Sequence, residues 1–259
     1  MIGTDAAPTA LIEALSLAVR KRRAAPAAQG ELEVRLGRWL AGASFQPGVS
    51  KDVFDDLEGE MCKQFVTDDK WHEVVDYHYR CPDGRTVRTR VEFDLAIMAV
   101  RRTHIQKDEQ ASITFARTCG GDACRVVCNV EMPTIEVPQC CHPHHVRVKQ
   151  RKCFRDVRMG HVVWRYELSR TWCGPDAASA ERMKKVSPPT YEVECELVDE
   201  DGHYMDKYDD EHIGLSLLLK GKILMGDEED AHVHLVTPAC AKRRPVRHTP
   251  KAKRPRASE

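Results

Sequence analysis

The 259-residue sequence lacks the signatures of several common protein classes. No apolar run reaches the roughly 18 residues that a membrane-spanning helix needs, so we expect no membrane association. The longest candidate, IGLSLLLKGKILMG (213–226), is interrupted by lysines and glycines and predicts a partly buried helix. GxxxxGK[ST], GxSxG and HExxH motifs are absent, which argues against P-loop enzymes, α/β-hydrolases and zincins.

The sequence also lacks a net charge, because forty Lys and Arg residues balance forty Asp and Glu residues. Composition alone therefore indicates no nucleic-acid partner. The charge is unevenly placed, however, since the tail from Lys242 onward carries eight Lys or Arg, one Glu and three prolines. We expect 227–259 to be a disordered basic tail that is simply solvated, tethers RNA or directs nuclear import.

A signal-peptide hydrophobic region is missing, and the eleven cysteines cannot all pair with one another because their number is odd. Both features favour a reducing intracellular compartment. The length suits one large domain with appendages. Residues 1–30 form the first appendage, a helix and a short linker.

Two segments near the beginning of the chain predict helices. The segment 8–23 has an apolar stripe on one helical face, formed by Leu11, Leu15, Ala18 and Val19. Ser50 is a suitable N-cap for a second helix. In that helix, apolar residues recur every four positions at Val53, Leu57, Met61 and Phe65.

Six later segments alternate apolar and polar residues, as strands with one buried face do. They are 31–38, 85–95, 124–131, 146–154, 161–169 and 191–197. Their polar faces are almost entirely ionic and sorted by sign. Three glutamates on one open strand face, as in YEVECEL (191–197), would repel each other. An antiparallel barrel brings faces of opposite sign together across a lumen, whereas the simpler alternative is a sheet with a charged, solvated face.

These charged faces have the composition of a phosphate-handling site. Carboxylates on neighbouring strands can bind a hard divalent cation such as magnesium or manganese. Arginine and lysine can hold a polyanion, arginine through bidentate contacts to phosphate. A metal, several cations and a carboxylate that positions water are the groups required for phosphoanhydride hydrolysis.

Three stretches carry a resemblance to a known family: ELEVRLGR (31–38), FQPGVS (45–50) followed by a helix, and YEVECEL. Together they resemble the tunnel-type, metal-dependent RNA 5′-triphosphatases of mRNA capping, found in fungi, protozoa and large DNA viruses. The resemblance implies a mainly β, α+β fold: an eight-stranded antiparallel barrel with flanking helices at 31–226. It implies removal of the γ-phosphate from triphosphate-ended RNA, followed by a guanylyltransferase, and manganese-dependent hydrolysis of nucleoside triphosphates. It also implies a nuclear location, or a cytoplasmic one for a viral protein.

The resemblance assigns roles to individual residues. The metal would be bound directly by Glu31, Glu33 and Glu196, and through water by Glu194. The phosphates would be bound by Arg88, Lys149, Arg151 and, on a looser match, Lys107. The catalytic strands contribute Arg165, Glu167 and Glu131, where Glu131 would position the attacking water and nearby Glu136 is the alternative. Supporting positions are Glu192, Ser169 and Arg147.

Two other functions fit parts of the sequence. A zinc-stabilised nucleic-acid-binding module without catalysis would use a Cys/His-rich region, formed by Cys119, Cys124, Cys128, Cys140, Cys141, His142, His144 and His145. Alternatively, the same tunnel would act on inorganic polyphosphate, thiamine triphosphate or ATP. FQPGVS favours the RNA-capping branch by resemblance.

Overall fold

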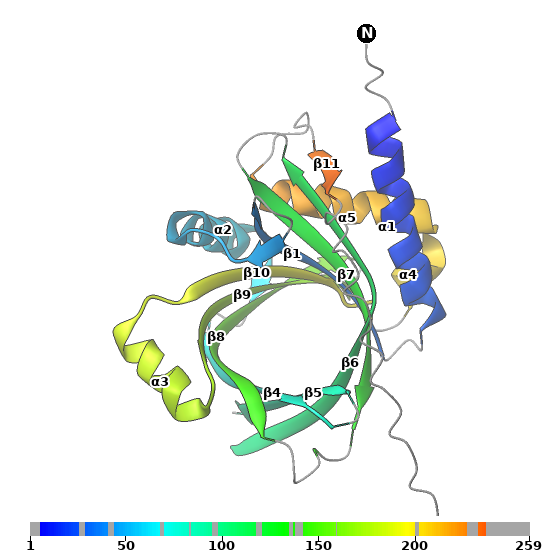
Figure 1. Cartoon of the computed structure of the whole chain (residues 1–259). Helices are drawn as coiled ribbons and strands as arrows, with labels where there is room; N and C mark the ends of the chain where they lie inside the picture. The colour runs from blue at the N-terminus through cyan, green and yellow to red at the C-terminus, as the bar shows by residue number, and fades with distance from the viewer. Residues whose placement is uncertain are drawn as a thin grey trace, which may run out of the picture.

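A computed structural model describes residues 6–25, 29–40, 44–67, 70–82, 84–94, 98–117, 121–134, 137, 142–158, 160–199, 202–226 and 233–236. Its eight principal strands are β1 (Gly30–Leu40), β4 (His72–Arg80), β5 (Thr86–Asp94), β6 (Ala99–Arg117), β7 (Asp122–Pro133), β8 (Pro143–Arg158), β9 (His161–Gly174) and β10 (Thr190–Leu197). They form an antiparallel barrel in the order β10-β9-β8-β4-β5-β6-β7-β1, which closes because β1 also pairs with β10. Figure 1 looks along the barrel axis into the lumen.

Three short strands extend the barrel. β2 (Ser44–Pro47) forms a hairpin with β1, β3 (Val66–Thr67) pairs with β8, and β11 (Val233–Val236) pairs with β6. β11 lies inside the segment predicted to be a disordered tail, so that prediction is wrong for these four residues. The reason is that β6 offers an edge for backbone hydrogen bonding, and Val233 packs against the hydrophobic core.

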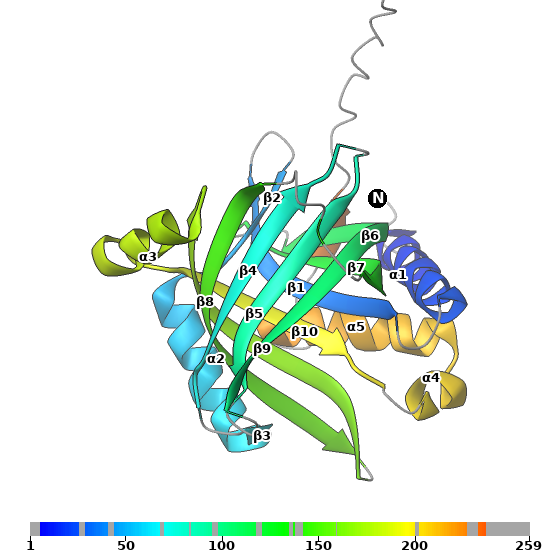
Figure 2. The ribbon, with the colours of Figure 1, turned by 90° about the horizontal axis from the view of Figure 1, so that it is seen from below.

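Helices cover the outside of the barrel (Figures 1 and 2). α1 (Ala6–Ala24) and α5 (Asp210–Leu224) pack against each other and against β1, while α1 also covers β6 and β7. α2 (Lys51–Gln64) lies near β10, and α3 (Ala177–Val186) lies against β8 and β9. The short α4 (His203–Lys207) leads into α5. No helix in the described ranges is long and apolar enough to span a bilayer.

The main hydrophobic core lies between the barrel wall and these helices, not inside the barrel. Leu32, Val34 and Leu36 of β1 point outward into this core and are buried. Leu11 and Leu15 meet them from α1, and Leu217 from α5. The alternating residues of β1 are thereby left to face the lumen.

The predicted second helix forms, and the Ser50 side chain caps it by accepting a hydrogen bond from the Val53 backbone N–H. Its predicted apolar stripe is wrong at one position. Val53 is 41% exposed, whereas Phe54 is fully buried. Phe54 faces the barrel because its ring packs against Tyr191, with ring centroids 5.0 Å apart.

All six predicted strand segments lie in barrel strands: β1, β5, β7, β8, β9 and β10. The two strands that complete the ring, β4 and β6, were not identified from the pattern. In β6 a register shift between Glu109 and Ala111 interrupts the alternation. In β4 the lumen face carries an apolar residue, Val74, beside the charged Asp76, and both are buried.

Candidate active site

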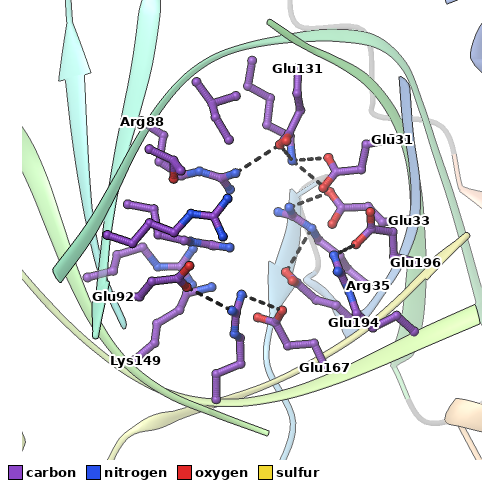
Figure 3. Close-up of a pocket in the computed structure, with 18 residues that line it drawn as sticks. Glu31, Glu33, Arg35, Arg88, Glu92, Glu131, Lys149, Glu167, Glu194 and Glu196 are labelled. Carbon is purple, nitrogen blue, oxygen red and sulfur yellow. Dashed lines mark hydrogen bonds and ion pairs between the residues drawn. The ribbon is translucent and has the colours of Figure 1, made fainter. Parts of the chain in front are cut away.

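The lumen contains a strongly ionic cavity of about 270 Å³. Seven glutamates and nine arginines or lysines line it, and Thr103 and Ile105 are its other two residues. Figure 3 shows the carboxylates and the cations pointing into one space from opposite strands. The charged strand faces therefore point inward, as expected for a barrel rather than for a solvated sheet.

The closure of the barrel brings the two acidic strands together. In the β1–β10 ladder, Glu33 lies opposite Glu196, and Arg35 lies opposite Glu194. Glu31 lies two residues before Glu33, on the same face of β1. Two pairs of carboxylates about 160 residues apart in sequence therefore form one wall of the lumen, which we call the acidic wall (Glu31, Glu33, Glu194 and Glu196).

Three cations form ion pairs with these four carboxylates. Arg35 Nη2 donates to Glu33 Oε1 over 2.6 Å, and its Nε lies 3.2 Å from Glu194 Oε1. Lys107 pairs with Glu31 and lies 3.5 Å from Glu33 Oε1. Arg165 pairs with Glu196.

Burial raises the pKa of Glu33 to about 7, since Glu33 is only 3% exposed. Repulsion from Glu31 and Glu194 adds to this rise in pKa, whereas Arg35 and Lys107 oppose it. Burial acts on Glu194 as well, but Arg35 and Lys149 outweigh it and hold the pKa of Glu194 below its ordinary value. The acidic wall therefore retains a site where a proton, or another cation, is favoured at neutral pH.

The acidic wall is suited to a hard cation by the chemistry of its donors. All its potential ligand atoms are carboxylate oxygens, which magnesium and manganese prefer. In the described ranges, however, no three His, Cys, Asp or Glu side chains are arranged as a metal-binding group. Lys107, Arg35 and Arg165 are paired with these carboxylates, so a cation would bind here only if these ion pairs rearranged.

Across the lumen lies the basic wall (Arg88, Arg90, Arg147, Lys149 and Arg151), carried by β5 and β8. Arg88 Nη2 donates to Glu131 Oε1 over 3.1 Å, and Arg151 Nη1 donates to Glu167 Oε2 over 3.2 Å. Glu131 is also 3.4 Å from the amine of Lys107. Glu131 therefore connects the basic wall to Lys107, which in turn pairs with Glu31 of the acidic wall.

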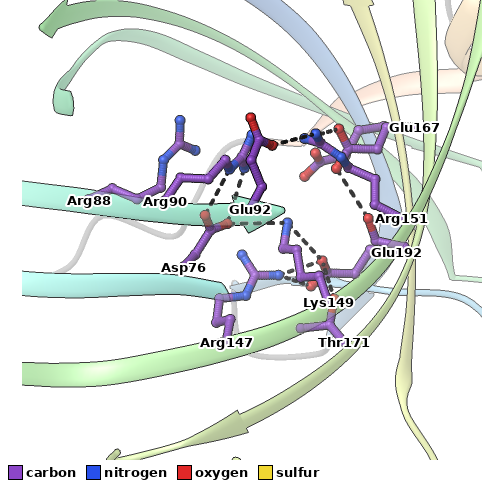
Figure 4. Close-up of polar contacts among 12 residues, drawn as sticks. Asp76, Arg88, Arg90, Glu92, Arg147, Lys149, Arg151, Glu167, Thr171 and Glu192 are labelled. Carbon is purple, nitrogen blue, oxygen red and sulfur yellow. Dashed lines mark hydrogen bonds and ion pairs between the residues drawn. The ribbon is translucent and has the colours of Figure 1, made fainter. Parts of the chain in front are cut away.

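A second ionic cluster backs the basic wall (Figure 4). Arg90 donates two hydrogen bonds to Asp76 of β4, of 2.8 and 3.1 Å. The Lys149 amine lies 3.9 Å from Asp76 and 3.7 Å from Glu192. Burial raises the pKa of Asp76, but Arg90 and Lys149 outweigh it and hold that pKa well below its usual range.

The structure gathers most of the predicted site residues in the lumen. Twelve line the cavity: Glu31, Glu33, Arg88, Lys107, Glu131, Arg147, Lys149, Arg151, Arg165, Glu167, Glu194 and Glu196. The supporting residues are adjacent to them: Ser169 donates to Glu167 over 3.1 Å, and Glu192 pairs with Arg147 and accepts from Thr171. Glu136 lies outside the described residues.

Sequence reasoning did not nominate several residues of the site. These are Arg35, Asp76, Arg90, Glu92, Arg101 and Asn129. Alternation already places Arg35 on the face of Glu33, and Arg90 on the face of Arg88, so the pattern could have identified both. Asp76 could not be found this way because β4 itself was not recognised.

The residues proposed for a zinc site do not gather in one place. Cys124 and Cys128 of β7 are buried against the covering helices. His144 and His145 lie on β8, which is separated from β7 by β4, β5 and β6. Cys119, Cys140 and Cys141 lie outside the described residues. The described part of the Cys/His-rich region therefore gives no support to the zinc-stabilised module.

Comparison with known proteins agrees with this architecture. No protein-family model matches the sequence, and no curated protein matches it at a significant level. The structure is similar to that of the S. pombe Pct1 RNA triphosphatase, with a TM-score of 0.60 and 13% sequence identity over 86% of this chain and 94% of that one. A structure of Pct1 in complex with the Spt5 CTD gives the same TM-score, with 14% identity over 86% and 95% of the two chains.

A viral protein has a similar structure. The Mimivirus capping enzyme triphosphatase matches with a TM-score of 0.54 and 13% identity over 82% of this chain and 94% of that one. The chain has the triphosphate-tunnel fold. The expected eight-stranded antiparallel barrel is thereby confirmed.

Proposed function

We propose that this protein is a metal-dependent RNA 5′-triphosphatase that converts triphosphate-ended RNA to diphosphate-ended RNA, the first step of mRNA capping. One observation carries the proposal: the acidic wall on β1 and β10 faces the basic wall on β5 and β8 across a single lumen. Such a lumen can bind a cation on one side and phosphates on the other. The similarity in fold to RNA triphosphatases from a yeast and a virus supports it.

In this proposal Glu31, Glu33 and Glu196 hold a magnesium or manganese ion directly, and Glu194 holds it through water. When bound, the ion neutralises charge on the phosphates. It would also neutralise negative charge in the acidic wall, where four carboxylates share three cations.

The side chains of the basic wall hold the substrate in line for attack. Arg88, Lys149 and Arg151 bind phosphate oxygens, and Arg165 approaches from β9. Glu131, held by Arg88, orients the water that attacks the γ-phosphorus. The bond from that phosphorus to the bridging oxygen of the β-phosphate breaks, which releases inorganic phosphate and diphosphate-ended RNA.

The proposal includes manganese-dependent hydrolysis of free nucleoside triphosphates, because the proposed contacts involve only phosphates and no base. It also includes transfer of the diphosphate end to a guanylyltransferase, in the nucleus or, for a viral protein, in the cytoplasm.

The test uses RNA labelled at the γ-phosphate, with magnesium or manganese, and the variants Glu33→Ala and Glu196→Ala. We expect metal-dependent phosphate release, none from the α position, and a loss of about 10²–10³-fold in each variant. Glu73→Ala is the matched control, because Glu73 lies on β4 outside the cavity and pairs with Lys184 of α3. Equal activity in all four proteins refutes the proposal, and a preference for tripolyphosphate over RNA reassigns the substrate to a small triphosphate.

A further inference from the structure

A second cavity lies outside the lumen, at one end of the barrel. It measures about 420 Å³ and is formed where the β8–β9 turn approaches α4. Figure 2 shows this turn and α4 at the same end of the barrel, opposite the end that carries β2. We call it the rim pocket, and its principal side chains are Arg158, His161, His203, Tyr204, Lys207 and Tyr208.

Flat rings dominate the rim pocket. The rings of Tyr204 and Tyr208 are 4.8 Å apart, and those of His161 and His203 are 5.0 Å apart. Tyr204 is held in place, because its ring packs edge-on against Trp164 and its hydroxyl lies 3.2 Å from Ser216 Oγ. One face of the Tyr208 ring is covered, because it stacks on His212 with ring centroids 4.2 Å apart. The pocket therefore offers fixed aromatic rings whose remaining surfaces can stack on a planar group.

Two cations lie at the rim pocket. The guanidinium of Arg158 donates to Asp156 over 3.3 and 3.2 Å, but the Arg158 side chain is 58% exposed and can make further contacts. The Lys207 amine is 5.2 Å from the ring centre of Tyr208. Among the described residues that line the pocket, Asp199 is the one acidic side chain, and it accepts hydrogen bonds from Tyr204 N over 2.8 Å and Met205 N over 2.9 Å. Rings combined with cations are the components of a surface that binds single-stranded nucleic acid.

Two backbone segments, β9 and the end of β10, connect the rim pocket to the candidate active site. Val163 of the pocket stands two residues before Arg165 on β9, and Asp199 stands three residues after Glu196 of β10. The backbone holds these segments together, since Val198 N donates to Val163 O over 3.0 Å. At about 3.3 Å per residue, the pocket begins roughly 7–10 Å from the residues assigned to phosphate and metal.

We propose that the rim pocket binds the first nucleosides of the RNA whose triphosphate lies in the lumen. The RNA then leaves the barrel at the end that carries α4 and the β8–β9 turn. The bases stack on Tyr208 and the histidines, and Arg158 and Lys207 contact the backbone phosphates. Because stacking is possible for every base, we expect little sequence preference. This inference rests on the proposed function.

The kinetic test compares two substrates, triphosphate-ended RNA and inorganic tripolyphosphate, which has no base. In the double variant His203→Ala/Lys207→Ala we expect KM for the RNA to rise about ten-fold, with unchanged kinetics on tripolyphosphate. His144→Ala/Lys185→Ala is the matched control, because it removes the same two side-chain types at exposed positions outside both cavities. Unchanged RNA kinetics in the double variant, or equal changes on both substrates, would overturn the inference.

A second measurement does not depend on hydrolysis. Triphosphate-ended RNA with 4-thiouridine at its second position is photo-crosslinked to the wild-type protein, and the crosslinked peptides are identified by mass spectrometry. We expect crosslinks within 158–163 or 203–208, whereas crosslinks confined to the opposite end of the barrel would overturn the inference. If neither substrate is hydrolysed, the proposed function is refuted. The crosslinks then still show whether the RNA binds at the rim pocket.

Discussion

The acidic and basic walls of the lumen are both ionic, but their charges are balanced to different degrees. On β1 and β10, four carboxylates share Arg35, Lys107 and Arg165. On β5 and β8, five cations pair with five carboxylates: Asp76, Glu92, Glu131, Glu167 and Glu192. The acidic wall thus has one carboxylate more than it has cations, whereas each cation of the basic wall has an acidic partner. The comparison indicates that the acidic wall is the side of the lumen that favours a further cation.

A similar contrast exists within the basic wall. Arg88 and Arg90 stand two residues apart on β5, but Arg88 reaches Glu131 in the cavity, whereas Arg90 is fixed by two hydrogen bonds to Asp76, which is 1% exposed. We infer that Arg88 is available to a substrate and that Arg90 chiefly stabilises the barrel.

The largest effect is expected from Glu33→Gln in the acidic wall. Because the pKa of Glu33 is about 7, the amide resembles its protonated form and should preserve the fold. We expect phosphate release to fall about 10²–10³-fold. We also expect manganese to raise the Tm of the wild type but not that of the variant. Activity and thermal unfolding with and without manganese measure this. An undiminished manganese shift in the variant would falsify the assignment of Glu33 as a ligand.

The second prediction separates Arg88 from Arg90. Arg90→Ala leaves Asp76 with only the more distant Lys149, so the free energy of unfolding should fall by about 3 kcal/mol. Arg88→Ala should change it by less than about 1 kcal/mol, yet lower kcat/KM about 10²-fold. Urea unfolding and steady-state kinetics of both variants provide the measurement. Equal destabilisation by the two changes would contradict the distinction.

The smallest effect concerns pH. Because the pKa of Asp76 is depressed in the folded protein, its ionised form stabilises the fold above about pH 4, and this contribution is lost as the pH falls further. We expect Asp76→Asn to be less stable than wild type at pH 6, with the difference shrinking by about 1 kcal/mol by pH 3. Urea unfolding at pH 6, 4 and 3 measures it, and a difference independent of pH would speak against a role for the charge.

Much of this site could be predicted from alternation alone. Glu31, Glu33, Glu194 and Glu196 stand on strands whose other faces are apolar, so the side that points away from the core was determined by the pattern. The alternation also placed Arg88 and Arg151 toward the lumen. The family resemblance added what the pattern lacked, namely a ring of eight strands and a distribution of roles.

The remaining features depend on partners distant in sequence. Whether a lumen arginine is available or engaged depends on the neighbouring strand, as with Arg90 and Asp76, and sequence spacing contains no such information. The shift in register within β6 interrupts the alternation of apolar and polar residues. For this reason β6 was not recognised as a strand, although Lys107 lies on it. Phe54 replaced Val53 as the buried residue of α2 because the adjacent strand β10 supplies Tyr191.

The pairing of β1 with β10 has a consequence for biosynthesis. During translation Glu33 emerges early, and its neighbour Glu196 is added only after the six intervening strands of the ring. A nascent chain therefore has no complete acidic wall, and a fragment that ends before β10 leaves Glu33 on an unpaired strand edge. Ring closure, the contact of longest sequence separation in the barrel, is thus the same event as assembly of the candidate metal-binding site.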